Sequence, residues 1–468
     1  MRNMVFSQVS LRRFNFVSAG FIFPVLLLVG TASAQTVTTL YSFGWFGSHP
    51  PDAPVQGRDG QLYGTTSNGF ISNGCCGTIF RVSTSGKAAL LHDFTGFDGY
   101  NPSGGLTLGA DGNFYGTTFE GGYFGYGVLF KVTPAGSLTV LHYFNSDGTD
   151  RNFPEAPPIL ASDGNYYGTT DAGGTNDAGV VYKVTPTGAY SIIYNLDLAM
   201  ADTPIGPPTQ GTDGNLYVTA FYRETSACGS LMKISTAGLL INSYLLDCPP
   251  DGESPYTLIQ ASDGNFYGTT HYGGAYSGGV LFRLSRSFSY TVAHSFGASQ
   301  TEGANPTGPA MQATDGNLYG LDRFGGDFGY GTIYRCALNR TCSTLHNWSS
   351  TVSAGGGIVQ HTNGILYGVT ADGGIYSAGS VFSLNLGLKP GIALVLYRSN
   401  AGSTVQILGQ GLTGTTSVDF NGVQATSFKV VRDTYMTAVV PSGATSGPVV
   451  VTTPTGVLRS IKGFQVIR

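Results

Sequence analysis

A block of eight residues recurs seven times at nearly constant spacing, and such a period restricts the chain to a repeat architecture. The copies begin at residues 59, 111, 163, 213, 263, 315 and 363, and the second and fifth both read DGNFYGTT. The steps between them run from 48 to 52 residues. A period of about 50 residues is typical of a four-stranded propeller blade.

The second copy shows how one repeat is expected to fold. Four strands, A to D, are predicted at 104–110, 113–118, 128–132 and 137–144. Asp111-Gly112 is a dipeptide that favours the tight turns of β-hairpins, and it stands between strands A and B. The strands mix aromatic and β-branched residues, as in sheets that are buried on both faces. No amphipathic helical period is found in the repeats.

The ends of the repeat region predict a closed ring. Residues 36–43 read as a strand D that lacks its own A, B and C, whereas the seventh copy ends after strand C. Pairing of these two parts would leave no exposed sheet edge. The prediction is therefore all-β: a seven-bladed β-propeller over 35–386 that is closed by the N-terminal strand, then a small immunoglobulin-like β-sandwich over 387–468.

The repeats, for example DGNYYGTTDAGGTNDAGVVYKVTPTGAY, resemble the GloVer (Gloeo/Verruco) tandem repeat of exported bacterial proteins. The tail, with VDFNG, VVPSGATSG and VTTPTG, resembles an IPT/TIG domain, an immunoglobulin-like module. The resemblance implies shape and location, and it carries no reaction or catalytic residues. The members have interchangeable surface anchors, and FQVIR at the end of this chain does not match one.

The first 34 residues are predicted to be a secretory signal peptide, with three arginines before the apolar run FIFPVLLLVG and TASA at the end. Without them 20 Lys and Arg face 27 Asp and Glu, a net charge of −7. This balance disfavours nucleic acid and anionic membranes as partners. No other run is long and apolar enough to span a bilayer. We expect a secreted or extracytoplasmic protein, at the cell surface or in the periplasm.

Six cysteines in an exported chain suggest disulfide bonds. Cys228 and Cys248 lie symmetrically about the C–D turn of the fourth copy, and Cys336 and Cys342 do so in the sixth. Both pairs are predicted to bridge a hairpin. The adjacent Cys75 and Cys76 stand in a longer B–C loop, either as a structural staple or as a vicinal disulfide with a redox or ligand role.

In six copies the motif aspartate is followed by a cation 20 residues later, or 22 in the first copy, where the loop is longer. In the seventh copy both charges are lost together, at Asn363 and Ser383. We therefore predict a structural ion pair in each of the other copies rather than a metal or catalytic site. These pairs are Asp59–Arg81, Asp111–Lys131, Asp163–Lys183, Asp213–Lys233, Asp263–Arg283 and Asp315–Arg335.

The B–C loops and D–A crossovers share one face of the predicted propeller, which is the candidate ligand surface. Its aromatic candidates are Tyr123, Tyr126, Tyr272, Tyr276, Phe328, Tyr330 and Tyr376, and its acidic candidates are Asp98, Asp147, Asp251 and Glu302. Aromatic rings with acids and hydroxyls suit sugar recognition, and a ring of acids also attracts cations. The alternative is that the rings seal neighbouring sheets and the acids only form turns. Strand D carries His92, His142, His294 and His346 at a position that holds Tyr in other copies, and we interpret it as a packing position.

Two functions stay open on the sequence. The first is a non-catalytic recognition or surface scaffold protein whose partner is a polysaccharide or another protein. The alternative is a propeller hydrolase or lyase on extracellular polysaccharide, with carboxylates across the central mouth. Only 11% of the residues are charged, against about 25% in typical soluble domains. No nucleophile-elbow, phosphate-binding or zinc-binding motif is present. We therefore expect no catalytic residues, metal ligands or cofactor, and bound calcium is the one alternative retained.

Overall fold

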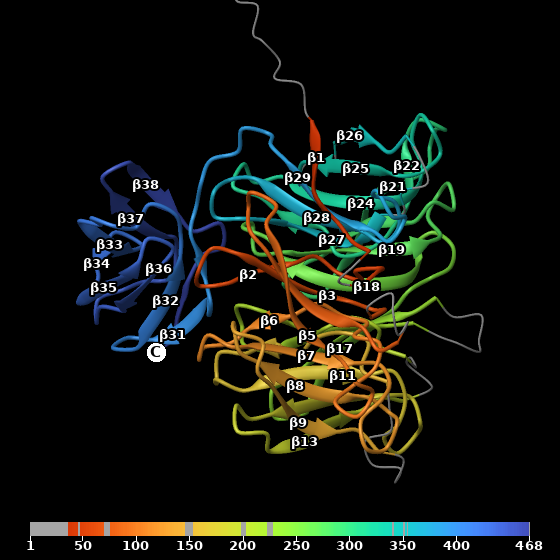
Figure 1. The fold of residues 1–468 in the computed structure, drawn as a ribbon, viewed down its shortest axis with the longest axis horizontal. Helices are drawn as coiled ribbons and strands as arrows, with labels where there is room; N and C mark the ends of the chain where they lie inside the picture. Colours follow the sequence, from red (N-terminus) through yellow and green to blue (C-terminus); the bar gives the residue numbers. More distant parts are fainter. Residues whose placement is uncertain are drawn as a thin grey trace, which may run out of the picture. The chain divides into compact units, whose positions relative to one another are not determined.

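The described part of the chain is all-β. The computed structural model describes residues 36–44, 47–69, 75–145, 153–197, 203–221, 228–338, 341–349, 352 and 354–467. Within these ranges 39 strands form ten sheets and no helix is present (Figure 1). No helix in this described part could therefore cross a membrane. Residues 35–468 form one compact unit.

Each repeat forms one antiparallel sheet whose strands follow chain order. The first two sheets contain β2 (Val55–Gln56), β3 (Leu62–Thr66), β4 (Thr78–Val82) and β5 (Ala88–Asp93), then β6 (Thr107–Leu108), β7 (Phe114–Thr118), β8 (Val128–Val132) and β9 (Leu138–Tyr143). The next two contain β10 (Ile159–Leu160), β11 (Tyr166–Thr170), β12 (Val180–Val184) and β13 (Tyr190–Asn195), then β14 (Thr209–Gln210), β15 (Leu216–Ala220), β16 (Ser230–Ile234) and β17 (Leu240–Leu245).

The fifth and sixth sheets have longer inner strands. They contain β18 (Glu253–Gln260), β19 (Phe266–Tyr272), β20 (Val280–Leu284) and β21 (Tyr290–Ser295), then β22 (Gly303–Pro306), β23 (Met311–Gln312), β24 (Leu318–Gly325), β25 (Thr332–Cys336) and β26 (Cys342–Asn347). Strand A of the second copy is shorter than predicted. Gly104, at its expected start, instead packs closely against the next copy. A Cβ added to Gly104 would lie only 2.9 Å from the Ala156 Cα.

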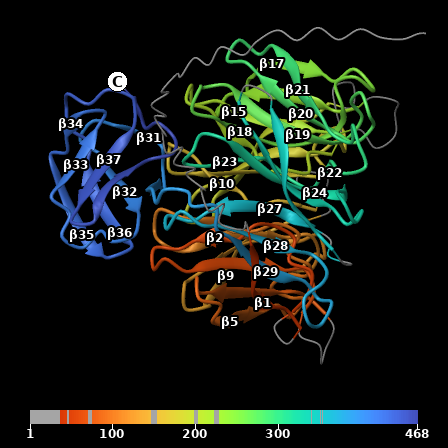
Figure 2. The ribbon, with the colours of Figure 1, turned by 90° about the horizontal axis from the view of Figure 1, so that it is seen from above.

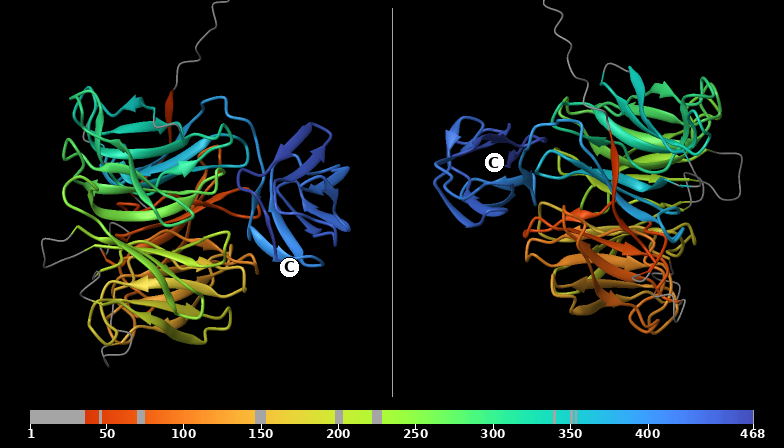
Figure 3. Two further views of the ribbon diagram at one scale, coloured as in Figure 1. Left: turned by 180° about the vertical axis from the view of Figure 1, so that it is seen from behind. Right: turned by 45° about the horizontal axis from the view of Figure 1, so that its top comes forward.

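The last sheet combines both ends of the repeat region. It contains β27 (Ala354–Gln360), β28 (Leu366–Thr370) and β29 (Ser380–Leu384), and β1 (Val37–Ser42) pairs antiparallel with β29. The pairing of the N-terminal strand with the last copy was expected from the sequence. Figures 1 and 3 show the red N-terminal strand beside the blue strands of this sheet. An edge that would otherwise be open is thereby covered.

A buried glutamine also joins the first copy to the seventh. The Gln56 amide donates to the Thr362 hydroxyl at 2.8 Å, and its carbonyl oxygen accepts from the Thr362 backbone N–H at 3.0 Å. The same link joins four further pairs of consecutive copies, through a glutamine carbonyl that accepts a backbone N–H at 2.8 Å. These links are Ser162–Gln210, Thr212–Gln260, Ser262–Gln312 and Thr314–Gln360. The glutamine therefore acts as a connector between neighbouring sheets.

We predict that Gln56→Leu lowers the free energy of unfolding by about 1–3 kcal/mol, because it leaves the buried N–H of Thr362 without its acceptor and removes one of the two donors to the Thr362 hydroxyl, the other being Gln410. Leucine is already tolerated at this position in two copies, as Leu108 and Leu160. Denaturant unfolding of Gln56→Leu, Thr362→Val and the double variant measures the coupling. If the two losses simply add, the link does not hold the first and last copies together.

The turn aspartate is held by hydrogen bonds within its own repeat. In the sixth copy Asp315 Oδ1 accepts the Asn317 backbone N–H at 3.1 Å. Its Oδ2 accepts the Asn317 amide at 2.7 Å and the Tyr319 hydroxyl at 2.7 Å. The same three contacts occur in the second, third, fourth and fifth copies. The aspartate therefore shapes the turn and satisfies the tyrosine hydroxyl.

The predicted cation is an additional partner of this aspartate. Lys183 Nζ lies 3.4 Å from Asp163 Oδ2, and Lys233 Nζ lies 2.8 Å from Asp213 Oδ2. The other four predicted pairs stay predictions. In the seventh copy Asn363 keeps the turn without charge, because its Oδ1 accepts the Ile365 N–H and its amide donates to the Tyr367 hydroxyl. The hydrogen bonds, rather than the ion pair, are thus common to charged and neutral copies.

The same tyrosine packs against the next copy along the chain. Tyr115 stacks on Tyr166 with ring centroids 3.9 Å apart, and Tyr217 stacks on Phe266 at 3.9 Å. Tyr63 stacks on Phe114 at 4.2 Å. Turn geometry and packing between sheets are therefore coupled through one side chain.

We predict that Asp315→Ala lowers the free energy of unfolding by about 1–3 kcal/mol, because the Tyr319 hydroxyl loses its acceptor. Asp315→Asn is the matched control, and it should cost less than half as much because Asn363 already performs this role in the seventh copy. Thermal unfolding at neutral pH measures both. Equal losses would show that the carboxylate charge, not the hydrogen bonds, holds the turn.

The C-terminal strands form two further four-stranded antiparallel sheets and one parallel pair (Figure 2). The sheets contain β30 (Ala393–Leu394), β32 (Thr404–Leu408), β36 (Tyr435–Val439) and β35 (Ser427–Arg432), and β34 (Val423–Gln424), β33 (Ser417–Phe420), β37 (Val449–Thr453) and β38 (Gly456–Arg459). The parallel pair is β31 (Arg398–Asn400) with β39 (Gln465–Ile467).

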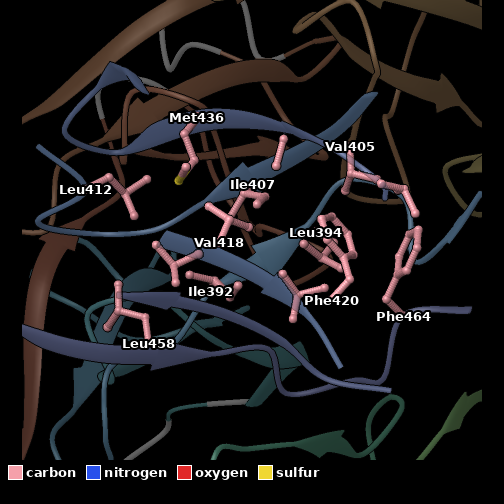
Figure 4. Packing of buried hydrophobic residues seen from close by; sticks show 14 of the residues in the cluster. Ile392, Leu394, Val405, Ile407, Leu412, Val418, Phe420, Met436, Leu458 and Phe464 are labelled. Atoms are coloured by element: carbon pink, nitrogen blue, oxygen red, sulfur yellow. The ribbon is translucent and has the colours of Figure 1, made fainter. Parts of the chain in front are cut away.

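The two C-terminal sheets share one hydrophobic core. Ile407 and Met436 come from one sheet, and Val418, Phe420 and Leu458 come from the other; all five lie in the same cluster (Figure 4). Burial alternates along β33 and β37, so each strand buries one face. In contrast, β3, β7 and β11 are buried at every position, as strands covered on both faces are.

All three predicted cysteine pairs are at disulfide distance. Cys336 and Cys342 are cross-strand partners between β25 and β26, with Cα atoms 4.0 Å apart. Cys228 pairs with Cys248, with Cα atoms 5.8 Å apart. Cys75 pairs with its neighbour Cys76. The described cysteines therefore include no free thiol.

Candidate functional site on the loop face

The second threonine of the repeated block fixes the start of each B–C loop. The Thr118 hydroxyl donates to the Glu120 carbonyl at 2.9 Å and accepts the Val128 N–H at 3.1 Å. The third and fifth copies repeat both contacts. The block thus controls both ends of strand B, namely the tight turn at one end and the variable loop at the other.

The D–A crossovers reach this face through a strained residue before proline. The backbone of Asn101 has φ of 55°, and its N–H donates to the Cys76 carbonyl of the preceding loop at 3.0 Å. Positive φ is uncommon for residues other than glycine, and a following proline further restricts the backbone. The same conformation occurs at His49, Phe153, Thr203, Ser254 and Asn305. Recurrence in six copies shows that the crossover is a defined structural element.

Most of the predicted aromatic residues are exposed. Tyr123 is 79% exposed, and Tyr272, Tyr276, Phe328, Tyr330 and Tyr376 are between 41% and 57% exposed. Tyr126 is half-buried and packs edge to face with Phe153, with ring centroids 5.9 Å apart, so it helps to seal neighbouring copies. Phe97 and Phe324, which were not among the predicted site residues, are 80% and 50% exposed. The face therefore presents aromatic rings on the B–C loops of the second, fifth, sixth and seventh copies.

The described acidic candidates are bonded within their own crossovers. Asp98 accepts from His92 at 2.8 Å and from the Thr95 N–H at 2.8 Å. Glu302 likewise contacts His294 Nε2 at 2.7 Å and accepts the Ala298 N–H at 2.8 Å.

In the fourth copy the strand-D position is tyrosine, and the Tyr244 hydroxyl donates to Asp251 at 2.7 Å. Asp147 lies outside the described residues. The His or Tyr position of strand D therefore has a second role beside packing, because it binds the crossover acid. The role of these acids in binding a ligand stays a prediction.

We predict that Asp98 contributes about 1 kcal/mol of stability at pH 7 after allowance for solvent screening. Burial opposes ionisation, but hydrogen bonds from His92 and Thr95 lower the pKa of Asp98 to about 2. A depressed carboxyl pKa stabilises the fold above the unfolded pKa, and this contribution is lost as the pH falls from about 4 to about 2. In unfolding measurements from pH 7 to pH 2, Asp98→Asn should be less stable than wild type at pH 7, and the difference should vanish near pH 2. Asp247→Asn, an exposed acid of another crossover, serves as the control. A difference that is independent of pH would contradict the prediction.

A cavity of about 330 Å³ opens on this face where the first, fifth, sixth and seventh copies meet. Its polar lining residues include His49, Tyr256, His271, Arg323 and Asp372. His49 Nε2 lies 3.1 Å from Asp372 Oδ1, and both side chains are almost half exposed. This volume is within the range of small-molecule sites, about 300–1,000 Å³.

The groups of this cavity favour binding of a polar ligand. Burial lowers the pKa of His271, Arg323 lowers it further, and the hydrogen bond with the Pro306 carbonyl opposes the shift. The bond to that carbonyl, at 3.1 Å, requires the proton on Nδ1, so Nε2 is left as an acceptor in the neutral ring. Burial raises the pKa of Tyr256, which stays a neutral donor at pH 7. The cavity thus offers a guanidinium, a phenol, two imidazoles and one carboxylate.

These cavity residues were not predicted from the sequence, although a signal for them exists. The eighth residue after the first residue of the motif takes six different identities in the seven copies. It is Ser67, Phe119, Asp171, Phe221, His271, Arg323 and Ala371. The eight-residue block before this position is similar in most copies. The variation that begins here marks the start of the loop, where the residues are not required by the repeat structure. Across the described residues, no group of three or more His, Cys, Asp or Glu is arranged to hold a metal ion.

The sheets and the loop face define an all-β repeat protein with propeller-like structural neighbours. A fungal alcohol oxidase of the AA5 family, solved with copper, has a TM-score of 0.51 at 12% identity, over 92% of this chain and 99% of that chain. A periplasmic gluconolactonase from Pseudomonas aeruginosa has a TM-score of 0.45 at 14% identity, over 70% of this chain and 97% of that chain. At such identities the likeness shows the fold alone. No curated protein matches the sequence.

The sequence itself identifies the family. The Gloeobacter/Verrucomicrobia repeat matches residues 19–232, 153–382 and 204–431, in three overlapping segments that span most of the chain. The protein belongs to the Gloeobacter/Verrucomicrobia repeat family.

Proposed function

We propose that this chain is an exported, non-catalytic recognition protein that binds an extracellular polysaccharide through its loop face. Its scaffold is a seven-bladed propeller over residues 35–386, followed by an immunoglobulin-like module of the IPT/TIG type over 387–468. Seven repeat sheets, the β1–β29 pairing and the Gln56–Thr362 link support the closed ring. Three cysteine pairs are compatible with an extracytoplasmic location.

The exposed aromatic rings of the loop face are the observation that carries this proposal. Tyr123 and Tyr276 expose 79% and 56% of their surface, and exposed apolar groups that gather on one face mark a candidate interaction site. Aromatic faces pack against the apolar faces of sugar rings, and the cavity supplies hydrogen-bond donors and acceptors for the hydroxyls. Four different copies carry such rings, which suits an extended polymer better than a small ligand.

The bonded acids favour recognition over hydrolysis. Glycoside hydrolysis requires two carboxyl groups about 5–9.5 Å apart that flank the scissile bond. Asp98, Asp251 and Glu302 instead hold their own crossovers, and Asp372 is paired with His49. A face that uses its described carboxylates in this way suits binding better than acid–base chemistry.

We predict that the mature chain binds at least one acidic or neutral polysaccharide on a glycan array, measured with and without calcium. Tyr123→Ala with Tyr276→Ala should weaken that binding at least tenfold, because each ring supplies stacking area. Leu239→Ala is the control, since Leu239 is 68% exposed but lies in a C–D turn, at the opposite end of its sheet. No binding to any polysaccharide in either condition would refute the proposal. Release of new reducing ends from a bound polysaccharide would refute its non-catalytic part.

A further inference from the structure

A second cavity, of about 320 Å³, lies at the opposite end of the repeat sheets. It is formed by the A–B turn ends of the third, fourth and fifth copies together with residues 395–398 and 462–465 of the C-terminal part. Its volume is at the lower end of the range for small-molecule sites, about 300–1,000 Å³. It is separate from the loop-face cavity, with which it shares no lining residue.

The charged residues that line this cavity are all cationic. Arg286, Arg398 and Lys462 contribute to its wall, and no Asp or Glu does. The whole chain has fewer Lys and Arg than Asp and Glu, 23 against 27. The charge of this cavity lining is therefore opposite in sign to the net charge of the protein.

None of these three cations forms an ion pair with a carboxylate of the described residues. Arg286 Nε donates to the Gly264 carbonyl at 3.1 Å, and Arg398 donates to the Ser162 hydroxyl at 3.4 Å. Lys462 Nζ lies 5.8 Å from the centre of the Tyr397 ring, and burial lowers the pKa of this ammonium.

The nearby turn aspartates are engaged elsewhere. Asp163 and Asp213 accept hydrogen bonds from their own Asn and Tyr residues and are paired with Lys183 and Lys233. The cavity cations are thus left without a counter-charge in the described structure. Arg286 is exposed and Arg398 and Lys462 are partly buried, and like charges that line one cavity repel each other, so a bound anion would offset that repulsion.

A neighbouring cavity is also lined by cationic side chains. It measures about 800 Å³, shares Ser262 with the first cavity and is lined by Lys389 and Arg459, again without an acidic residue. Residues with hydroxyl and amide groups also line the first cavity, among them Ser162, Thr212 and Gln260. Guanidinium groups bind the oxygens of sulfate, phosphate and carboxylate with paired hydrogen bonds, and hydroxyls complete such sites.

We propose that the cavity lined by Arg286, Arg398 and Lys462 is a binding site for an oxyanion, a sulfate, phosphate or carboxylate group, either free or carried by a sugar. The site is independent of the loop face and of the polysaccharide proposal. Arg398 and Lys462 belong to the C-terminal part whereas Arg286 belongs to the fifth repeat, so a bound anion bridges the two parts of the chain.

Isothermal titration calorimetry on the mature chain at constant ionic strength tests this proposal. The probes are inorganic sulfate, inorganic phosphate, glucuronate and glucose 6-phosphate, with glucose as the neutral control. We expect saturable binding of at least one anion and none of glucose. Tighter binding of the sugar-borne anions would assign the ligand to an acidic sugar, whereas equal binding of the free ions would assign it to the oxyanion alone.

Charge-removing variants locate the site. Arg398→Gln and Lys462→Met should each weaken binding at least tenfold, and Lys429→Gln, an exposed cation of the same C-terminal part, should change it less than twofold. Lys462→Met keeps most of the side-chain volume, so its thermal unfolding should be close to that of wild type even if Arg398→Gln is destabilised. Absence of saturable binding by all four anions, or an equal loss in Lys429→Gln, would overturn the proposal. The Tyr123→Ala, Tyr276→Ala variant should bind the anion normally, so failure of the loop-face proposal leaves this result unaffected.

Discussion

The hydrogen bond from the strand-B tyrosine to the turn aspartate is the contact on which the repeat depends. It closes the A–B turn, and it gives a buried phenol the partner that a polar group needs inside a fold. The ring of the same tyrosine stacks on the next copy, as Tyr115 does on Tyr166. Local turn geometry therefore sets the spacing between sheets. A second connector, the glutamine exemplified by Gln56, fixes neighbouring turns through backbone groups and joins the first copy to the last.

The two ends of each repeat sheet have different constraints. At the turn end the same Asp, Asn and Tyr recur because one geometry must be repeated. At the loop end the threonine of the repeated block fixes only where the loop begins, so the residues beyond it are free to differ between copies. His271 and Arg323 occupy equivalent positions in consecutive copies and have different chemistry. A stable scaffold with a variable rim is the usual arrangement for binding sites on loops.

Much of the fold could be predicted from the sequence, and the candidate site only in part. The repeat period, the Asp-Gly turns and the incomplete strand sets at both ends predicted four-stranded sheets and the pairing of β1 with the last copy. The paired symmetry of Cys336 and Cys342 about a turn predicted their contact. The sequence did not predict that Tyr319 binds Asp315, because residues four apart along a turn and strand meet only once the turn geometry is known. It also did not predict the two cavities, since each is assembled from copies or parts that are far apart in the chain.

The low charge of the protein makes its unpaired charges informative. The described loop-face acids are bonded within the fold, and Asp163 and Asp213 are each shared by a turn, a tyrosine and a lysine. Against this background, three cations that line one cavity without an ion-pair partner among the described residues are unusual. Mutual repulsion disfavours such a cluster, and a bound negative group would offset it. Under the two proposals, recognition is divided by chemistry: the loop end would bind hydroxyls and sugar ring faces, and the turn end beside the C-terminal sheets would bind oxyanions.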